Sequence, residues 1–271
     1  MSPEASAPPI LFFLLPGRLL SYFSSMPAQT ESSIGKAYGK RSFSNTHWSV
    51  VLSVNHCNSE VARAALGQIC RTYWYPLYAY VRRSGCSVED AEDLTQMFFE
   101  RLLENNSIGA VSPERGKFRS FLLASLKNFL INEWQKARAQ KRGGPHKLVS
   151  LEGTFEARYF REPADLMTPE ELYHRRWALT ILENVMSGLR EEYAEAGQVE
   201  QFDALKPAIA GGAIPYEAVA RQFNASQGAI RVWVHRLRKR YREALRSEVA
   251  QTVESPREIE GELRFLFSAI E

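Results

Sequence analysis

An acidic segment near position 90 contains the first residues along the chain that could carry chemistry. Asp93, Gln96 and Glu100 recur three and four positions apart, which places them on one face of a helix. Paired carboxylates can serve as a general acid and base, but no glycine-rich loop or converging histidine accompanies these. The opposite face carries apolar Leu94 and Phe98. The spacing predicts an amphipathic helix whose exposed row meets a partner, with a merely solvated acidic face as the alternative.

A basic helix predicted over 118–141 forms a second candidate surface. Lys127, Trp134, Arg138 and Lys141 fall within about 60° of one another at ~100° per residue, so they form one stripe. Cations can follow the phosphates of an unpaired strand, and an exposed ring lets a splayed base stack. The alternative is a core Trp134 among solvated bases. The other side can pack inward through Leu122, Leu126 and Phe129.

Residues 215–238 resemble a helix-turn-helix. Asn224 stands at the turn, where it tolerates a left-handed conformation, and Ser226 can cap the second helix. The first helix gains an apolar side from Ala218, Val219 and Phe223. The second helix has a buried stripe at Ile230, Val234, Leu237, Tyr241 and Leu245. Bases off this stripe suit the major groove of DNA. The basic blocks at 115–142 and 231–246 therefore suggest two places that meet a polyanion.

Several classes of protein are disfavoured. Ser120, Ser125 and the five histidines lack the spacing of a nucleophile, metal or phosphate motif, so we expect no enzyme, cofactor or metal. The apolar run at 10–15 is too short to span a membrane, which needs ~20 such residues. The cysteines have no Cys-x-x-Cys spacing and are expected to be free thiols in a reducing cytoplasm: Cys57, Cys70 and Cys86.

Helical periodicity dominates the chain, so we expect an all-α fold of two small helical domains joined by a flexible linker. Glycine, proline and weakly periodic stretches mark the boundaries. Translation could also begin at Met26. The expected parts are a disordered or misannotated tail at 1–45, a first domain at 46–142, a linker at 143–168, a second domain at 169–247 and a helical tail at 248–271.

Three segments together resemble the extracytoplasmic-function sigma factors. Asp90-Ala-Glu-Asp-Leu-Thr-Gln followed by Phe-Phe is similar to their region two, whose helix docks on RNA polymerase. The segment from Gly116 resembles the helix that melts and reads the minus-ten element. The helix-turn-helix resembles region four, which reads the minus-thirty-five element. Residues 72–83 and 235–242 also fit a planctomycete-like subgroup. The match in order and spacing covers roughly residues 46 to 247.

The resemblance implies a sigma factor with core RNA polymerase and promoter DNA as partners, and an anti-sigma factor as a further candidate. Met97 departs from the family, which usually has Glu there, and Trp233 replaces a basic or small residue. The alternative is a helix-turn-helix regulator that binds operators without docking on polymerase. Asp93, Gln96 and Glu100 would meet polymerase, while the candidate DNA-binding residues are Lys127, Asn128, Trp134, Arg138, Arg231, Val232, His235, Arg236 and Lys239.

Overall fold

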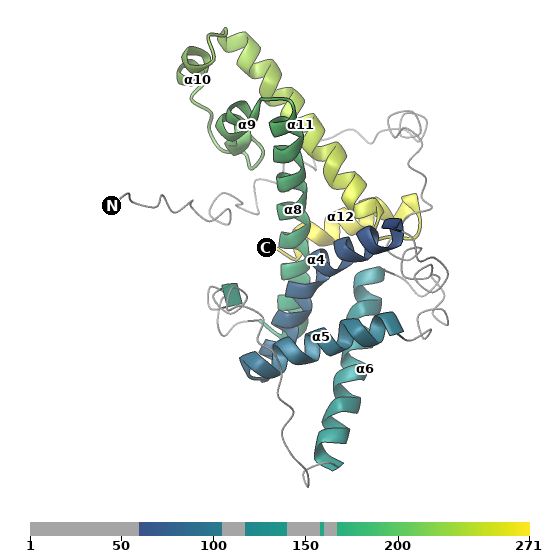
Figure 1. Ribbon diagram of the computed structural model, residues 1–271. Helices are drawn as coiled ribbons and strands as arrows, with labels where there is room; N and C mark the ends of the chain where they lie inside the picture. The colour runs from purple at the N-terminus through teal and green to yellow at the C-terminus, as the bar shows by residue number, and fades with distance from the viewer. Residues whose placement is uncertain (1–59, 105–116, 140–157, 160–166) are drawn as a thin grey trace. The chain divides into compact units, whose positions relative to one another are not determined.

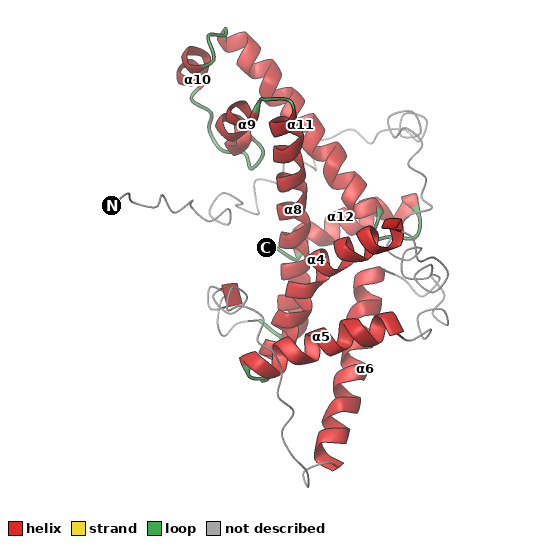
Figure 2. Cartoon of the chain, viewed as in Figure 1, coloured by secondary structure: helices red, strands yellow, loops and turns green. Residues whose placement is uncertain are grey.

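The regular elements in the described part of the chain are helices. The computed structural model describes residues 60–104, 117–139, 158–159 and 167–271, which contain no strand (Figure 1). Figure 2 shows these helices and the loops between them. The all-α prediction is confirmed, while the expected tail at 1–45 lies outside the described residues. The helices are α4 (Glu60–Arg83), α5 (Val88–Glu104), α6 (Phe118–Ala139), α8 (Pro169–Glu195), α9 (Val199–Leu205), α10 (Tyr216–Gln222), α11 (Gln227–Ala250) and α12 (Ile259–Ser268).

Short polar signals set the end of α4 and the start of α5. Gly85 has a left-handed φ of 96°, which glycine adopts readily and which ends α4. The Ser87 hydroxyl then accepts the Asp90 N–H at 3.1 Å and caps α5. Glu89 and Asp90 lie in the first turn, where negative charge suits the helix dipole. These residues therefore determine where α4 ends and α5 begins.

Aromatic side chains join α4, α5 and α6. Trp74 of α4 stacks on Phe99 of α5 with ring centroids 5.2 Å apart. Phe98 of α5 lies 5.8 Å from Phe129 of α6, between ring centroids. Each such pair contributes ~0.5–1.5 kcal/mol beyond its buried area. The pairs hold α5 against α4 and α6 against α5 in this part of the chain.

The buried row of α5 differs in part from the prediction. Phe98 and Leu102 are buried as expected, but Leu94 is only half-buried. Ala91 and Thr95 are fully buried in its place, and both lie at helical spacing from Phe98. The Thr95 hydroxyl donates to the Ala91 carbonyl at 2.7 Å, so this buried polar group is satisfied.

The residues predicted to form a helix-turn-helix fold as two helices, α10 and α11, joined by a turn. Asn224 has a φ of 48°, and the Ser226 hydroxyl accepts the Ala229 N–H at 3.1 Å. Both turn signals are therefore confirmed, as is the buried stripe of α11 at Ile230, Val234, Leu237, Tyr241 and Leu245.

The structure corrects the expectation at Ala218 and adds two details of this region. Ala218 is exposed, and the apolar side of α10 is formed by Val219 and Ala220 instead. Trp233 packs edge-on against Phe223 with ring centroids 6.1 Å apart. Residues 199–208 form α9 and then a 3-10 turn at Lys206–Ala208. Pro207 explains the division, because it lacks the N–H that would continue α9.

The described residues fall into two compact units. The α4–α6 unit contains α4, α5, α6, α8 up to Thr180, and Val249–Glu262; the helix-turn-helix unit contains Ile181–Glu248 and Leu263–Glu271. The domain boundaries expected from the sequence, at 142, 168 and 247, differ from the boundaries of these two units. The expected functional domains stay a prediction. Most of the expected linker, 143–157 and 160–166, lies outside the described residues.

Candidate nucleic-acid interface

The candidate docking face of α5 has unequal exposure. Glu100 is exposed, but Asp93 and Gln96 are half-buried, so the expectation of an exposed row is wrong at these two positions. The Gln96 amide donates to a Glu100 carboxylate oxygen at 2.9 Å. Burial raises the pKa of Asp93, and the negative charges of Asp90 and Glu89 raise it further. The first half of α5 thus concentrates negative charge around a partly sheltered carboxylate.

Met97 lies beside this polar row and is 38% exposed. Methionine is enriched in protein–protein interfaces, where it adapts to the opposing surface. The departure from the family pattern at this position therefore replaces a charge with an exposed apolar contact. An exposed methionine beside a row of polar and acidic side chains suits contact with a protein partner better than it suits acid–base chemistry.

The outer face of α6 presents aromatic, aliphatic and amide side chains. Trp134 is 42% exposed and Ile131 is 49% exposed, and Asn128 is also exposed. The alternative that Trp134 belongs to the core is therefore wrong. The sequence reading missed Ile131, although its position three residues before Trp134 on the same stripe signals it. Arg138 lies in α6, but its side chain is outside the description. The inward side is buried as predicted at Leu122, Leu126 and Phe129.

Lys127 has an intramolecular partner that the sequence reading missed. Its Nζ lies 2.6 Å from Oε1 of Glu170, at the start of α8. Hydrogen bonding to Glu170 raises the pKa of Lys127, and the same bond lowers the pKa of Glu170. Both side chains remain exposed by about two fifths, and such pairs contribute at most ~1 kcal/mol. A phosphate group would have to displace this carboxylate to reach Lys127.

The structure brings all five candidates on α11 onto its exposed side. Val232 is 47% exposed despite being apolar. The Arg231 guanidinium lies 5.7 Å from the centroid of the Tyr216 ring, which orients it beside α10. The exposed set is Arg231, Val232, His235, Arg236 and Lys239. This placement leaves cationic and apolar groups available on the first turns of the helix.

Other bases of α11 have internal roles. Arg238 donates from Nε to the Ala208 carbonyl at 2.9 Å, which ties α11 to the 3-10 turn. Arg240 makes a two-pronged pair with Glu192, at 3.0 Å and 2.7 Å. An open pocket of about 430 Å³ beside this pair is also lined by Arg236 and Lys239. Glu192 and Glu243 also line the pocket, so its three bases exceed its acids by one charge. Glu243 lies 4.0 Å from the Nζ of Lys239.

The described residues thus define an all-α protein with an acidic helix, a basic aromatic helix and a helix-turn-helix. Residues 71–140 match the family model for sigma-70 region 2, which supports a sigma-70 family protein. The matched range includes α5 and α6 entirely. Sigma-70 factors initiate transcription and are not enzymes, so the match supports the prediction of a non-enzymatic protein. No curated protein and no solved structure matches the chain.

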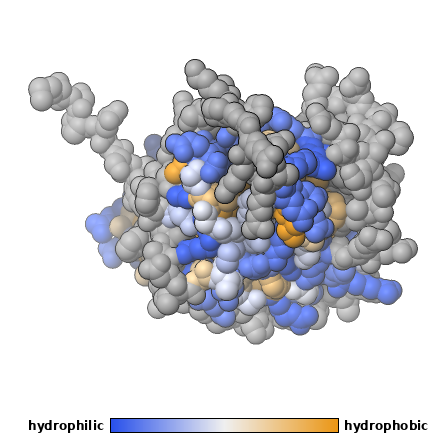
Figure 3. Space-filling model, turned by 90° about the horizontal axis from the view of Figure 1, so that it is seen from below, coloured by the Kyte–Doolittle hydropathy of each residue, from blue (hydrophilic) through white to orange (hydrophobic). Residues whose placement is uncertain are grey.

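The surface agrees with a protein that meets polar partners. The described residues on the face shown in Figure 3 are mainly hydrophilic, with apolar side chains at isolated positions. Isolated apolar residues of this kind are ordinary on protein surfaces. Within the described ranges, no helix combines the length and the hydropathy that crossing a membrane requires.

Proposed function

We propose that the chain is a cytoplasmic sigma factor of the extracytoplasmic-function type, which binds core RNA polymerase and directs promoter-specific initiation. The match to sigma-70 region 2 carries this proposal, because it spans both α5 and α6. An operator-binding regulator needs neither an acidic docking helix nor an exposed aromatic residue on a basic helix. The planctomycete-like subgroup is supported by the sequence phrases at 72–83 and 235–242.

Each candidate surface has a distinct role in the proposal. The face of α5 with Asp93, Gln96 and Glu100 binds polymerase, and Met97 adds an apolar contact. The outer face of α6 receives the opened strand, with Trp134 stacking on an unpaired base. The exposed side of α11 reads the upstream duplex element. An anti-sigma factor would compete for the same α5 face.

Run-off transcription with purified core polymerase on a promoter library tests the class of protein. We expect transcripts from a defined promoter subset that depend on this chain. Asp93→Ala combined with Gln96→Ala should lower core affinity in a titration while circular dichroism shows intact helices. Duplex binding without polymerase-dependent initiation would instead indicate the helix-turn-helix regulator.

A further inference from the structure

Helix α6 begins with an unfavourable charge arrangement. Its first turn has no acidic residue and contains Arg119, while Lys117 directly precedes the helix. The first turn of any helix carries unpaired N–H groups and a partial positive charge. Basic side chains at this end add to that charge. The start of α6 therefore needs an acceptor and a negative charge from another part of the chain.

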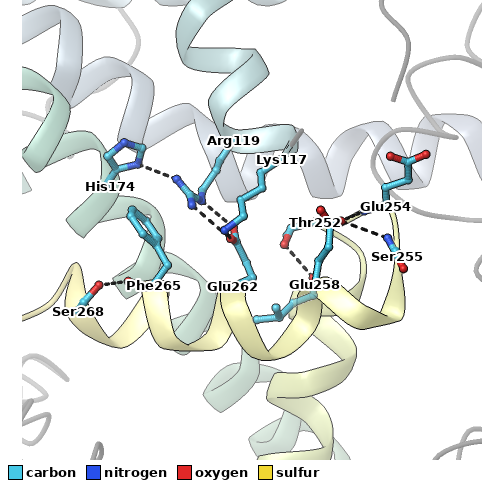
Figure 4. A network of polar contacts seen from close by, with 11 residues as sticks. Lys117, Arg119, His174, Thr252, Glu254, Ser255, Glu258, Glu262, Phe265 and Ser268 are labelled. Carbon is cyan, nitrogen blue, oxygen red and sulfur yellow. Dashed lines mark hydrogen bonds and ion pairs between the residues drawn. The ribbon is translucent and has the colours of Figure 1, made fainter. Parts of the chain in front are cut away.

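The C-terminal segment supplies both the hydrogen-bond acceptor and the negative charge. The N–H of Phe118, the first residue of α6, donates to the Thr252 carbonyl at 3.4 Å. Glu262 of α12 accepts from Arg119 at both oxygens, at 2.6 Å from Nε and 3.2 Å from Nη2. The Nζ of Lys117 lies 2.6 Å from Oε2 of the same carboxylate. Figure 4 shows both cations converging on Glu262.

This ion cluster is internal to the α4–α6 unit. Glu262 is fully buried and Arg119 is 4% exposed. The Tyr173 hydroxyl donates to the Arg119 carbonyl at 2.9 Å, and the Arg119 guanidinium lies 5.2 Å from the centroid of the Trp177 ring. Removing one partner of a buried pair leaves the other charge uncompensated, which is strongly destabilising locally. Glu262 thus controls the environment of the whole first turn of α6.

We propose that Val249–Glu262 is a positioning element for α6, with Glu262 as the positioning residue, and that promoter opening depends on it. This proposal rests on the sigma-factor function proposed above. Residues 118 and 134 are separated by roughly 24 Å along the helix axis, at 1.5 Å per residue. A small change of direction at the first turn therefore displaces Trp134 from the strand it would contact.

The positioning role predicts a selective defect. The orientation of α5 is fixed on the other side by the stacking of Trp74 on Phe99. Loosening the first turn of α6 should therefore spare the polymerase-docking face. A role in global stability alone would instead weaken polymerase binding and opening together.

The test compares the full-length Glu262→Gln protein with the wild type and with Glu260→Gln, which removes an exposed carboxylate from the same helix. Lys117→Met is a milder second variant that keeps the buried Arg119–Glu262 pair. Amide hydrogen exchange reports the first turn of α6 directly. Core affinity and permanganate reactivity of promoter thymines in the holoenzyme, on duplex and pre-melted templates, report function.

We expect Glu262→Gln to accelerate exchange in residues 118–122 by at least about tenfold while α5 keeps its protection. Core affinity should stay within about twofold, and duplex opening should fall by about tenfold, with recovery on the pre-melted template. Lys117→Met should also accelerate exchange in residues 118–122 and reduce duplex opening, but by less. Glu260→Gln should change neither the exchange nor the opening.

Unchanged exchange at 118–122, or unchanged opening despite faster exchange, would overturn the positioning role. Equal acceleration throughout the α4–α6 unit would also overturn it, because that result indicates loss of stability alone. If the wild-type holoenzyme fails to open any promoter, the proposed function fails and the dependence of promoter opening fails with it. The exchange data would then separately decide whether the C-terminal segment holds α6.

Discussion

The basic side chains of α6 differ in what they contact, and this difference decides their role. Arg119 is buried against Glu262, whereas Lys127 is exposed and meets Glu170 at the surface. The basic block at 115–142 suggested one of two places that meet a polyanion. The structure instead assigns Lys117 and Arg119 to the fold. The net charge of such a segment therefore overstates the surface available to nucleic acid.

Glu170 is expected to restrain DNA binding by Lys127. Glu170→Gln should strengthen binding of the full chain to single-stranded promoter DNA, because a phosphate would no longer compete with a carboxylate. The slope of log affinity against log salt should become steeper by about 0.7, the value for one extra phosphate contact on a single strand. Fluorescence anisotropy with a labelled oligonucleotide at several salt concentrations measures both quantities.

Glu171→Gln provides a control of equal charge at the neighbouring position. The Glu171 carboxylate accepts the N–H and hydroxyl of Thr168 at 2.8 Å and 2.9 Å, whereas the Nζ of Lys127 pairs with Glu170. The control should therefore leave the salt slope unchanged. If both variants strengthen binding equally, a general charge effect is responsible and the specific role of Glu170 is wrong.

Trp134 is expected to act in opening rather than in folding. Because the side chain is 42% exposed, Trp134→Ala should cost under ~0.5 kcal/mol of stability. Loss of one stacked base is worth ~1–3 kcal/mol, so open-complex formation should fall by roughly fivefold to a hundredfold. Permanganate reactivity of promoter thymines measures opening, and Trp134→Phe should retain most of it. Wild-type opening by Trp134→Ala on both duplex and pre-melted templates would refute this role.

At the scale of elements, local sequence determines most of what the structure shows. Helical periodicity, the Ser87 cap, the left-handed Asn224 and Gly85 together predict where α4, α5, α10 and α11 begin or end. These signals act over a few residues, so they can be read without tertiary contacts. The exposure of Trp134 also follows from its place opposite the buried side of α6.

The partners of these elements were not predictable from local pattern. Arg119 and Glu262 are separated by 143 positions, and no periodicity connects them. No periodicity connects Lys127 with Glu170 either, because their pairing depends on how α8 packs against α6. Half-burial of Asp93 likewise reflects neighbouring elements and not the spacing within α5. The candidate surfaces were therefore predicted better than the contacts that hold them in place.

Helix α11 should separate base reading from phosphate binding along its length. Arg236 lies on the exposed side of its third turn, and a good bidentate base contact is worth ~1–3 kcal/mol of discrimination. Arg236→Ala should therefore relax preference at one or two promoter positions. Lys239→Ala should weaken all sequences alike and reduce the salt slope by about one. Binding to a randomised duplex library measures both, and a uniform loss in both variants would mean that Arg236 is not a reader.

At the scale of the whole molecule, the C-terminal residues are part of the fold of each unit. Val249–Glu262 belongs to the α4–α6 unit, and Leu263–Glu271 belongs to the helix-turn-helix unit. Val253 and Leu266 are both fully buried. The tail expected at 248–271 therefore contributes core residues to both units. Stability of the chain consequently depends on contacts made by its last residues.

His174 should make this stability depend on pH. Its Nδ1 lies 3.4 Å from Nη1 of Arg119, so a neutral ring can accept that hydrogen bond. Burial and, to a smaller extent, the Arg119 charge lower the pKa of His174, and the net pKa is about 4. Glu262 and Glu170 oppose this shift and Lys127 adds to it. The folded protein thus keeps this imidazole neutral under conditions in which the unfolded chain protonates it.

The direction of the pH effect follows from proton binding. Below the ordinary histidine pKa of about 6.5, the unfolded state binds a proton that the folded state rejects until about pH 4. The free energy of unfolding should therefore fall as pH decreases through that window, and the contribution should be constant above it. Because His174 is half-buried, we expect a loss of only about 1 kcal/mol between about pH 7.5 and pH 5. Urea unfolding of the wild type, His174→Gln and the exposed-histidine control His235→Gln at both pH values measures it. His174→Gln should lose less stability on acidification than the other two proteins, and an equal loss in all three would exclude His174 as the source.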